Sequence, residues 1–154
     1  MIDLLAIAAF NAAYAEAIDS DSLERWPAFF CADCHYRITN LENERDGLPA
    51  GIVWADSRAM LEDRIAALRE ANIYERHRYR HLLGLPLIET ADAHCATART
   101  PFVVARIMHT GESGLFATGV YRDRFVSLDG RLLLAERVAV CDSTVTDTLL
   151  ALPL

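Results

Sequence analysis

The densest run of side chains that could do chemistry is 72–81, which reads Asn-Ile-Tyr-Glu-Arg-His-Arg-Tyr-Arg-His. In a helix, His77 and His81 would share one face and could bind a metal ion with Glu75 nearby. In a strand, His77, Tyr79 and His81 would line one face and three arginines the other. Because tyrosine favours strands and two leucines follow the run, the pattern favours a strand.

A strand with three arginines on one side is unusual for a core strand. It suits an edge that meets the carboxylates or carbonyls of another chain, because guanidinium groups bind both well. The predicted partner surface consists of Arg76, Arg78, Arg80, Tyr74, His77 and Trp54, with the apolar tail Leu149–Leu154 as a further candidate. A solvated strand face and a metal site are the two alternatives.

Two of the four cysteines form a CxxC pair, Cys31-Ala-Asp-Cys34. A structural zinc site normally needs a second ligand pair, and only the isolated Cys95 and Cys141 are left for it. A thioredoxin-type site would need a helix between the two cysteines, whereas a strand-like run follows them. The pattern therefore favours small buried hydrophobic residues over a zinc or redox site.

Three helical segments are expected in the first half of the chain. The first covers 3–18, and the second starts near Asp21, with Glu24 in capping-box position and Pro27 as a breaker. The third starts at Asp56 or Ser57. Between the second and third, 34–40 alternates as a strand and 41–51 reads as a polar loop.

The second half predicts a series of strands. A polar, aromatic-containing run over 75–88 is interrupted by Gly84 and Pro86, and strands are expected over 102–109, 115–128 and 131–141. Asp129-Gly130 predicts a type I′ hairpin turn. Gly119, in the middle of a long strand, indicates a bulge or bend of the kind that a curved sheet needs.

Composition narrows the class of protein. The chain has 154 residues, 15 arginines, no lysine, 22 acidic residues and a net charge of −7, which argues against nucleic-acid binding. No window approaches the run of about 18 apolar residues that a membrane helix requires. Without a secretion signal, a cytoplasmic location is expected. The length predicts a single domain over 1–154.

The order of these elements defines an α+β fold. Three N-terminal helices packed on a strongly curved, mainly antiparallel sheet would form a cone, as in cystatin-like and nuclear-transport-factor-like proteins. Such cones host enzymes that use an acid–base pair in their cavity. Tyr14, Tyr36, His81 and Asp123 could supply one, so a stand-alone isomerase or dehydratase is an alternative, as is a non-catalytic small-molecule binding module.

Five segments of the chain together resemble the small (β) subunits of Rieske-type aromatic-ring-hydroxylating dioxygenases. They are Phe10–Ala15, Trp26-Pro27 with Phe30, Cys34–Ile38, Asp56–Arg64 and Asn72–His81. The resemblance covers essentially the whole chain and is most specific over 56–81. The segments 51–57, 106–112 and 140–149 are similar to the branch of that family that acts on terephthalate.

This resemblance implies a partner. Such subunits assemble with a large (α) subunit, commonly as α3β3 with β–β contacts, and the large subunit carries a [2Fe–2S] Rieske cluster and a mononuclear Fe(II). A separate reductase supplies electrons from NAD(P)H, and the complex adds both atoms of O₂ to the aromatic ring. The chain itself lacks the C-x-H and C-x-x-H spacings of a Rieske cluster. We therefore predict no catalytic, cofactor-binding or metal-binding residue in it and a structural role.

Overall fold

The sheet at the centre of the molecule runs in the order β2-β1-β7-β6-β5-β3, with β4 paired to β5 beside this path. The structure, a computed structural model, describes residues 1–47, 53–71, 76–144 and 152–154. In these ranges the strands are β1 Phe30–Asn40, β2 Val53–Ala55, β3 His77–Leu83, β4 Leu87–Ala91, β5 Cys95–Met108, β6 Ser113–Leu128 and β7 Arg131–Cys141. Only β1 and β7 pair in parallel among these strands, which confirms the mainly antiparallel sheet.

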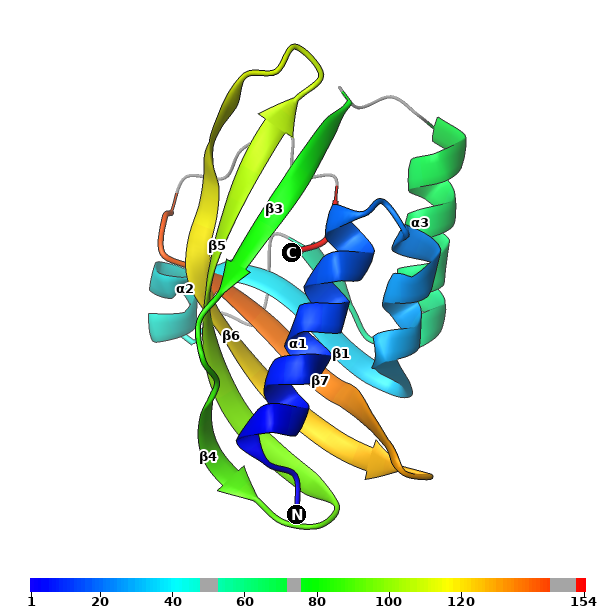
Figure 1. Cartoon of the computed structure of the whole chain (residues 1–154), viewed down its shortest axis with the longest axis vertical. Helices are drawn as coiled ribbons and strands as arrows, with labels where there is room; N and C mark the ends of the chain where they lie inside the picture. Colours follow the sequence, from blue (N-terminus) through cyan, green and yellow to red (C-terminus); the bar gives the residue numbers. More distant parts are fainter. Residues whose placement is uncertain (48–52, 72–75, 145–151) are drawn as a thin grey trace.

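The three predicted helices lie on one face of this sheet (Figure 1). They are α1 Leu4–Asp19, the 3-10 helix η1 Leu23–Phe29 and α3 Arg58–Ala71. Helix α1 begins where the Asp3 carboxylate accepts the Ala6 N–H at 2.8 Å. Helix α3 begins after Ser57, whose hydroxyl accepts the Met60 N–H at 3.2 Å. These side chains satisfy N–H groups that a helix end otherwise leaves unpaired.

Two local features differ from the prediction. The second helical segment is a 3-10 helix with Pro27 inside it rather than an α-helix. Part of the expected loop over 41–51 is a short helix, α2 Leu41–Arg45, so the prediction of a loop was wrong for these five residues. It forms because the side chain of Asn40 caps it by accepting the Asn43 N–H at 2.8 Å.

The strands predicted over 102–109, 115–128 and 131–141 are present; the first two are longer than expected and the third has the predicted bounds. Strand β5 begins at Cys95 instead of residue 102, and β6 begins at Ser113. The turn between β6 and β7 has φ values of 50° at Asp129 and 74° at Gly130, the positive pair that a type I′ turn requires.

The sheet curves through register shifts and one close approach. Shifts occur in β1 between Phe30 and His35, in β5 between Val104 and Ala105, and in β6 between Arg124 and Phe125. Gly119 of β6 lies between the positions of the last two shifts along that strand. A Cβ there would lie 2.1 Å from the carbonyl oxygen of Val140, so a side chain cannot fit. Gly119 therefore permits close packing, and the bulges themselves lie elsewhere in the strands.

The core between helices and sheet is rich in aromatic rings. Trp26, Phe30 and Tyr36 form a T-shaped cluster with centroids 5.1–5.8 Å apart, and Phe102 stacks on Tyr121 at 4.5 Å. All five rings are essentially inaccessible to solvent. Among the described residues, no helix combines the length and apolar character needed to cross a membrane.

Candidate functional site

The part of the run 72–81 that lies in a strand is 77–81, within β3, while 72–75 lie outside the described residues. In β3, Tyr79 and His81 are buried while Arg78 and Arg80 are exposed, which confirms the alternating alternative. A helical metal site formed by His77 and His81 is excluded, because residues four apart in a strand are separated by about 13 Å. His81 instead belongs to α1, since its Nδ1 lies 2.7 Å from Asp19 Oδ1 and its N–H donates to Asp19 Oδ2 at 2.8 Å.

Most arginine side chains of the strands lie on the side of the sheet opposite α1. Strand pairing places Arg80 opposite Ala105, Arg99 opposite Arg122, and Arg37 opposite Val138, so these residues share one face. We call this surface the basic sheet face; its arginines are Arg37, Arg78, Arg80, Arg99, Arg122 and Arg124. The chain as a whole carries −7, so positive charge concentrates here against the overall balance.

Only part of this positive charge is compensated within the described residues. Glu44 of α2 binds Arg37 at 3.1 Å and also contacts Arg122. Glu89 of β4 binds Arg99 at 2.8 Å. The other three arginines, Arg78, Arg80 and Arg124, have no carboxylate partner within the part of the chain that the structure describes.

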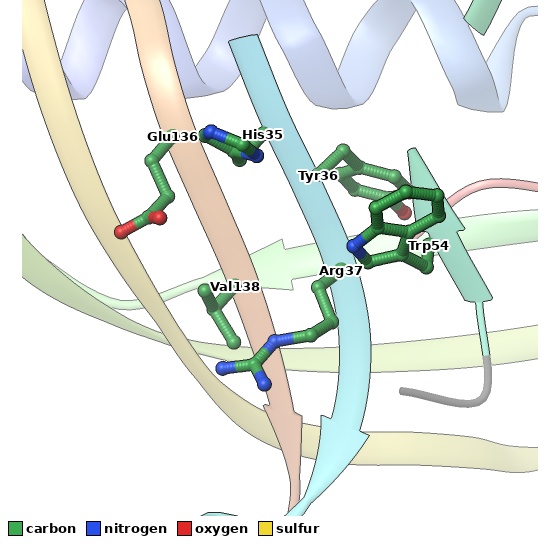
Figure 2. A pocket seen from close by; sticks show the side chains of 6 residues that line it. All are labelled: His35, Tyr36, Arg37, Trp54, Glu136 and Val138. Carbon is green, nitrogen blue, oxygen red and sulfur yellow. The ribbon is translucent and has the colours of Figure 1, made fainter. Parts of the chain in front are cut away.

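A shallow hollow of about 200 Å³ lies at the β2 side of the basic sheet face. Trp54 of β2 stands beside Arg37 of β1, and His35 lies near Glu136 of β7 (Figure 2). The indole of Trp54 is 53% exposed, which is high for so large an apolar ring. An exposed tryptophan beside an arginine and a hollow has the composition of a protein–protein hot spot.

The interior of the cone holds a buried ion pair. Arg137 of β7 makes two hydrogen bonds of 2.8 Å to the carboxylate of Asp123 of β6, and both side chains are 0% exposed. Its guanidinium also donates to Asn11 Oδ1 at 2.7 Å. The Arg137 Cζ lies 4.2 Å from the Tyr14 ring centroid and 4.0 Å from that of Tyr121.

The protonation state of this pair follows from its surroundings. Burial by itself would lower the pKa of Arg137, but the charge of Asp123 and its hydrogen bonds raise that pKa overall. The guanidinium therefore stays cationic. Asp123, one of the four candidates for an acid–base pair, is held as the counter-ion of an arginine and has no approach from solvent.

Two further candidates for the acid–base pair, Tyr14 and Tyr36, form hydrogen bonds with the backbone of Leu154. The Tyr14 hydroxyl donates to the backbone oxygen of Leu154 at 2.7 Å, and the Tyr36 hydroxyl donates to the same oxygen at 3.1 Å. The Leu154 N–H donates in turn to the Tyr36 oxygen at 3.0 Å. Burial raises the pKa of both tyrosines, so each hydroxyl remains a neutral donor.

The prediction for the apolar tail was wrong where it can be examined. Leu152 and Leu154 are 5% and 1% exposed inside the cone and so are not available to a partner. The physical reason is that the side chains of both leucines join the hydrophobic core, and that Tyr14 and Tyr36 form hydrogen bonds with the backbone of Leu154. The rest of the predicted tail, 149–151, lies outside the described residues.

Of the predicted partner residues, the structure places Arg78, Arg80 and Trp54 on the basic sheet face. Arg76 is exposed just before β3, and its carbonyl accepts the His109 N–H at 3.1 Å. His77 belongs to the inward-facing set of β3, and its ring centroid lies 5.4 Å from that of Tyr79 with the two rings tilted by 46°. Tyr74 lies outside the described residues.

Sequence reasoning missed the arginines of β1, β5 and β6, because they are scattered in sequence and only strand pairing collects them. A signal was available in β6, where Arg122 and Arg124 alternate with the inward-facing Tyr121, Asp123 and Phe125. The alternation marks an exposed basic face but does not tell which other strand supplies neighbours.

The cysteines and histidines do not fit a Rieske cluster. Cys34 is fully buried, and the next residue, His35, points to the opposite face of β1. Within the described ranges, no group of three or more His, Cys, Asp or Glu side chains is placed to hold a metal ion. Cys31 and Cys34 are small core residues as predicted, while Cys95 is exposed and Cys141 is partly buried.

Comparison with known proteins places the chain in a family. The SnoaL-like domain family matches residues 1–138. A solved structure from Novosphingobium aromaticivorans, the β subunit of a candidate aromatic-ring-hydroxylating dioxygenase, superposes with a TM-score of 0.90. It is 38% identical, and the match covers 98% of this chain and 96% of that one. This similarity confirms the cone fold.

Relatives that are similar in sequence narrow the class of protein to which the chain belongs. The chain is 68% identical over its full length, and that of the relative, to the β1 subunit of the terminal oxygenase component of terephthalate 1,2-dioxygenase from Comamonas. It is 42% identical to the anthranilate 1,2-dioxygenase small subunit from Burkholderia cepacia, over 92% of this chain and 88% of that one. The chain therefore belongs to the β subunits of aromatic-ring-hydroxylating dioxygenases, within the SnoaL-like family.

Proposed function

We propose that this chain is the structural β subunit of the terminal oxygenase of a terephthalate 1,2-dioxygenase, and that it holds the large subunits together in the oligomer. The observation that carries the proposal is the 68% identity to a terephthalate 1,2-dioxygenase β subunit over the full length of both chains. The large subunit carries the Rieske cluster and the mononuclear iron, and a separate reductase delivers the electrons. The assembly is α3β3, with residues 1–154 of each β chain forming one domain.

The contribution of this chain is a shaped and charged surface. The basic sheet face presents Arg78 and Arg80 beside one another on β3, without a described carboxylate to neutralise them. Burying such arginines against carboxylates of a partner would use both the charge and the hydrogen-bond donors of the guanidinium groups. Trp54 and the hollow beside it supply an apolar anchor. We assign the basic sheet face to the contact with the large subunit.

The alternative of a stand-alone isomerase or dehydratase is disfavoured by the interior of the cone. Each of its four candidate residues has a structural partner: Tyr14 and Tyr36 hold Leu154, His81 binds Asp19, and Asp123 binds Arg137. A general acid or base needs access to a substrate proton, and none of these groups has it in this arrangement.

Co-expression with the large subunit tests the proposal. The two chains together should form a large, iron-containing oligomer by native mass and metal analysis, and this chain alone should bind no iron. Arg78→Ala combined with Arg80→Ala should weaken assembly about 100-fold or more, because removing one partner of a buried ion pair costs about 3–5 kcal/mol.

Arg25→Ala is the matched control, because Arg25 pairs with Glu16 on the helical side with both side chains more than half exposed. It should leave assembly unchanged. Full assembly of the double variant would remove β3 from the interface. Failure of the wild-type chains to associate would refute the subunit assignment itself.

A further inference from the structure

Three exposed leucines lie toward the β3 edge of the basic sheet face, at the end of the sheet opposite to the hollow beside Trp54. Leu82 of β3, Leu87 of β4 and Leu115 of β6 are between 58% and 71% exposed. Leu87 pairs with Arg99 of β5 and therefore lies on the same face as this arginine. A single exposed leucine needs no explanation, but a contiguous apolar surface marks a contact with another molecule.

Strand register shows that the apolar surface is contiguous. Strand β5 runs between the three leucines, because it pairs with β3, with β4 and with β6. Leu82 lies directly opposite Val103, and Leu115 lies directly opposite Ala105. Side chains two residues apart in a strand share a face, so Pro101 joins Val103 and Ala105 there. We call this surface the leucine patch; its members are Leu82, Leu87, Pro101, Val103, Ala105 and Leu115.

The leucine patch borders two arginines that remain uncompensated. Arg80 lies directly opposite Ala105 of the patch, and Arg78 is two residues away on the same face of β3. Neither arginine has a carboxylate partner among the residues that the structure describes. A guanidinium group that becomes buried beside an apolar contact needs a counter-charge, because an unpaired buried charge is costly. The molecule that covers the patch should therefore combine apolar side chains with carboxylates.

A second copy of this chain, seated face to face on the patch, does not meet this requirement. A two-fold symmetric contact brings the same surface of both copies together. Arg78 and Arg80 of one copy would then approach the same arginines of the other, and like charges that meet across an interface oppose association. Charge complementarity thus favours an acidic partner over a second copy.

We propose that the leucine patch binds a segment of the large subunit in which apolar side chains are flanked by aspartate or glutamate. The inference rests on the proposed function and extends it, because it adds a second apolar anchor to the one at Trp54 and states the chemistry of the partner. The leucines supply the desolvated centre of the contact, and Arg78 and Arg80 supply its charged rim.

Two substitutions of opposite charge at one leucine test the chemistry of the partner. Leu115→Glu and Leu115→Lys both remove the apolar contact, but only Leu115→Glu brings a carboxylate toward an acidic partner. The complex co-expressed with the large subunit is diluted, and mass photometry gives the concentration at which half of it dissociates. Both variants should raise this concentration about tenfold, as the loss of a buried leucine predicts. Leu115→Glu should raise it about tenfold further, because like charges then meet.

Two further variants serve as controls. Leu115→Met keeps an apolar side chain of similar size and should dissociate at the wild-type concentration. Leu5→Glu is the matched control, because Leu5 is exposed to a similar extent but lies on α1, on the other side of the sheet. It should also leave dissociation unchanged. The thermal midpoint of each variant chain alone checks that these surface substitutions leave the fold intact.

The outcomes separate the patch from the proposed function. If the wild-type complex forms and the Leu115→Glu complex dissociates at the same concentration, the patch lies outside the interface and the proposal is overturned. Equal weakening by Leu115→Glu and Leu115→Lys would refute an acidic partner. Self-association of the wild-type chain alone, abolished by Leu115→Lys, would assign the patch to a second copy. Failure of the two wild-type subunits to associate would refute the proposed function itself, and the patch proposal with it.

Discussion

Arg137 shows how much a single buried charge depends on its partners. Its guanidinium is enclosed by the Tyr14 and Tyr121 rings and neutralised by Asp123, with Asn11 as a further acceptor. Burying an ion pair brings little net stability, but breaking one leaves an uncompensated charge in a medium of low polarity. Breaking the pair is therefore expected to lower the free energy of unfolding by more than the intact pair contributes to it.

We expect Arg137→Met to lower the free energy of unfolding by about 3–5 kcal/mol, measured by urea denaturation, because it strands the Asp123 carboxylate. Arg25→Met, which breaks an exposed pair, should cost less than about 1 kcal/mol. The double variant Arg137→Met/Asp123→Leu should recover much of the loss. Equal effects of the two single variants would show that the interior pair is solvated.

Two thiols, one fully and one partly buried, make stability dependent on alkaline pH. Burial raises the pKa of Cys34 and of Cys141 from 9.0 to about 11. The folded chain therefore keeps two protons that the unfolded chain releases, and stability must fall as the pH rises from about 9 to about 11. Below pH 8 these groups contribute no slope.

Denaturation at pH 8, 9 and 10 checks this expectation. The variant Cys34→Ala/Cys141→Ala should show a smaller fall between pH 9 and pH 10 than the wild type, whatever its stability at pH 8. Burial raises the pKa of Tyr14 and Tyr36 in the same way, so these tyrosines also lower stability near pH 10. Their contribution is the same in the wild type and in the variant, so the difference between the two slopes reports the thiols. An unchanged slope would assign the pH dependence to other groups.

At the scale of elements, the curvature of the sheet depends on β6. This strand pairs with β5 and with β7 along most of its length, with a register shift on each side of Gly119. At Gly119 the β7 backbone comes so close that a Cβ would contact Val140 at 2.1 Å. The bend that closes the cone around α1 therefore requires a glycine at this point.

Gly119→Ala should destabilise the fold by about 3 kcal/mol or more, because the clash is with backbone atoms that cannot rotate away. Gly114→Ala in the same strand is the control, since a Cβ there meets no atom within 4 Å. It should change the free energy of unfolding by less than about 0.5 kcal/mol. Similar denaturation midpoints for the two variants would contradict a packing role for Gly119.

At the scale of the whole molecule, arginine side chains gather on one side of the sheet. The basic sheet face collects six arginines on a chain whose net charge is −7. Such an arrangement orients the chain toward an acidic surface before contact and makes the association sensitive to salt.

Raising the NaCl concentration from about 0.1 M to about 1 M shortens the screening length from about 10 Å to about 3 Å. We expect this change to slow association with the large subunit severalfold, measured by surface plasmon resonance at increasing salt. Arg122→Ala/Arg124→Ala should reduce both the rate and its salt dependence. A salt-independent rate would show that the basic sheet face does not meet an acidic partner.

Sequence periodicity was sufficient for most of the elements. Alternation in 77–83 predicted a strand with Arg78 and Arg80 on one side, and the Asp129-Gly130 pair predicted its turn, because both depend on local backbone geometry. The short helix α2 was missed because a single side-chain cap at Asn40 decides it, and a polar pentapeptide has no apolar stripe to reveal it.

The sequence by itself determined the α+β order, the exposed arginines of β3 and, through its resemblance, the family, because each of these is written in residues close together along the chain. Only the tertiary structure decided that Arg37, Arg99, Arg122 and Arg124 join them on one face, and that Leu152 and Leu154 enter the cone instead of facing a partner. The first outcome depends on strand register. The second depends on which apolar surface of the core is available to the end of the chain. Those are contacts between distant segments, and no local pattern encodes them.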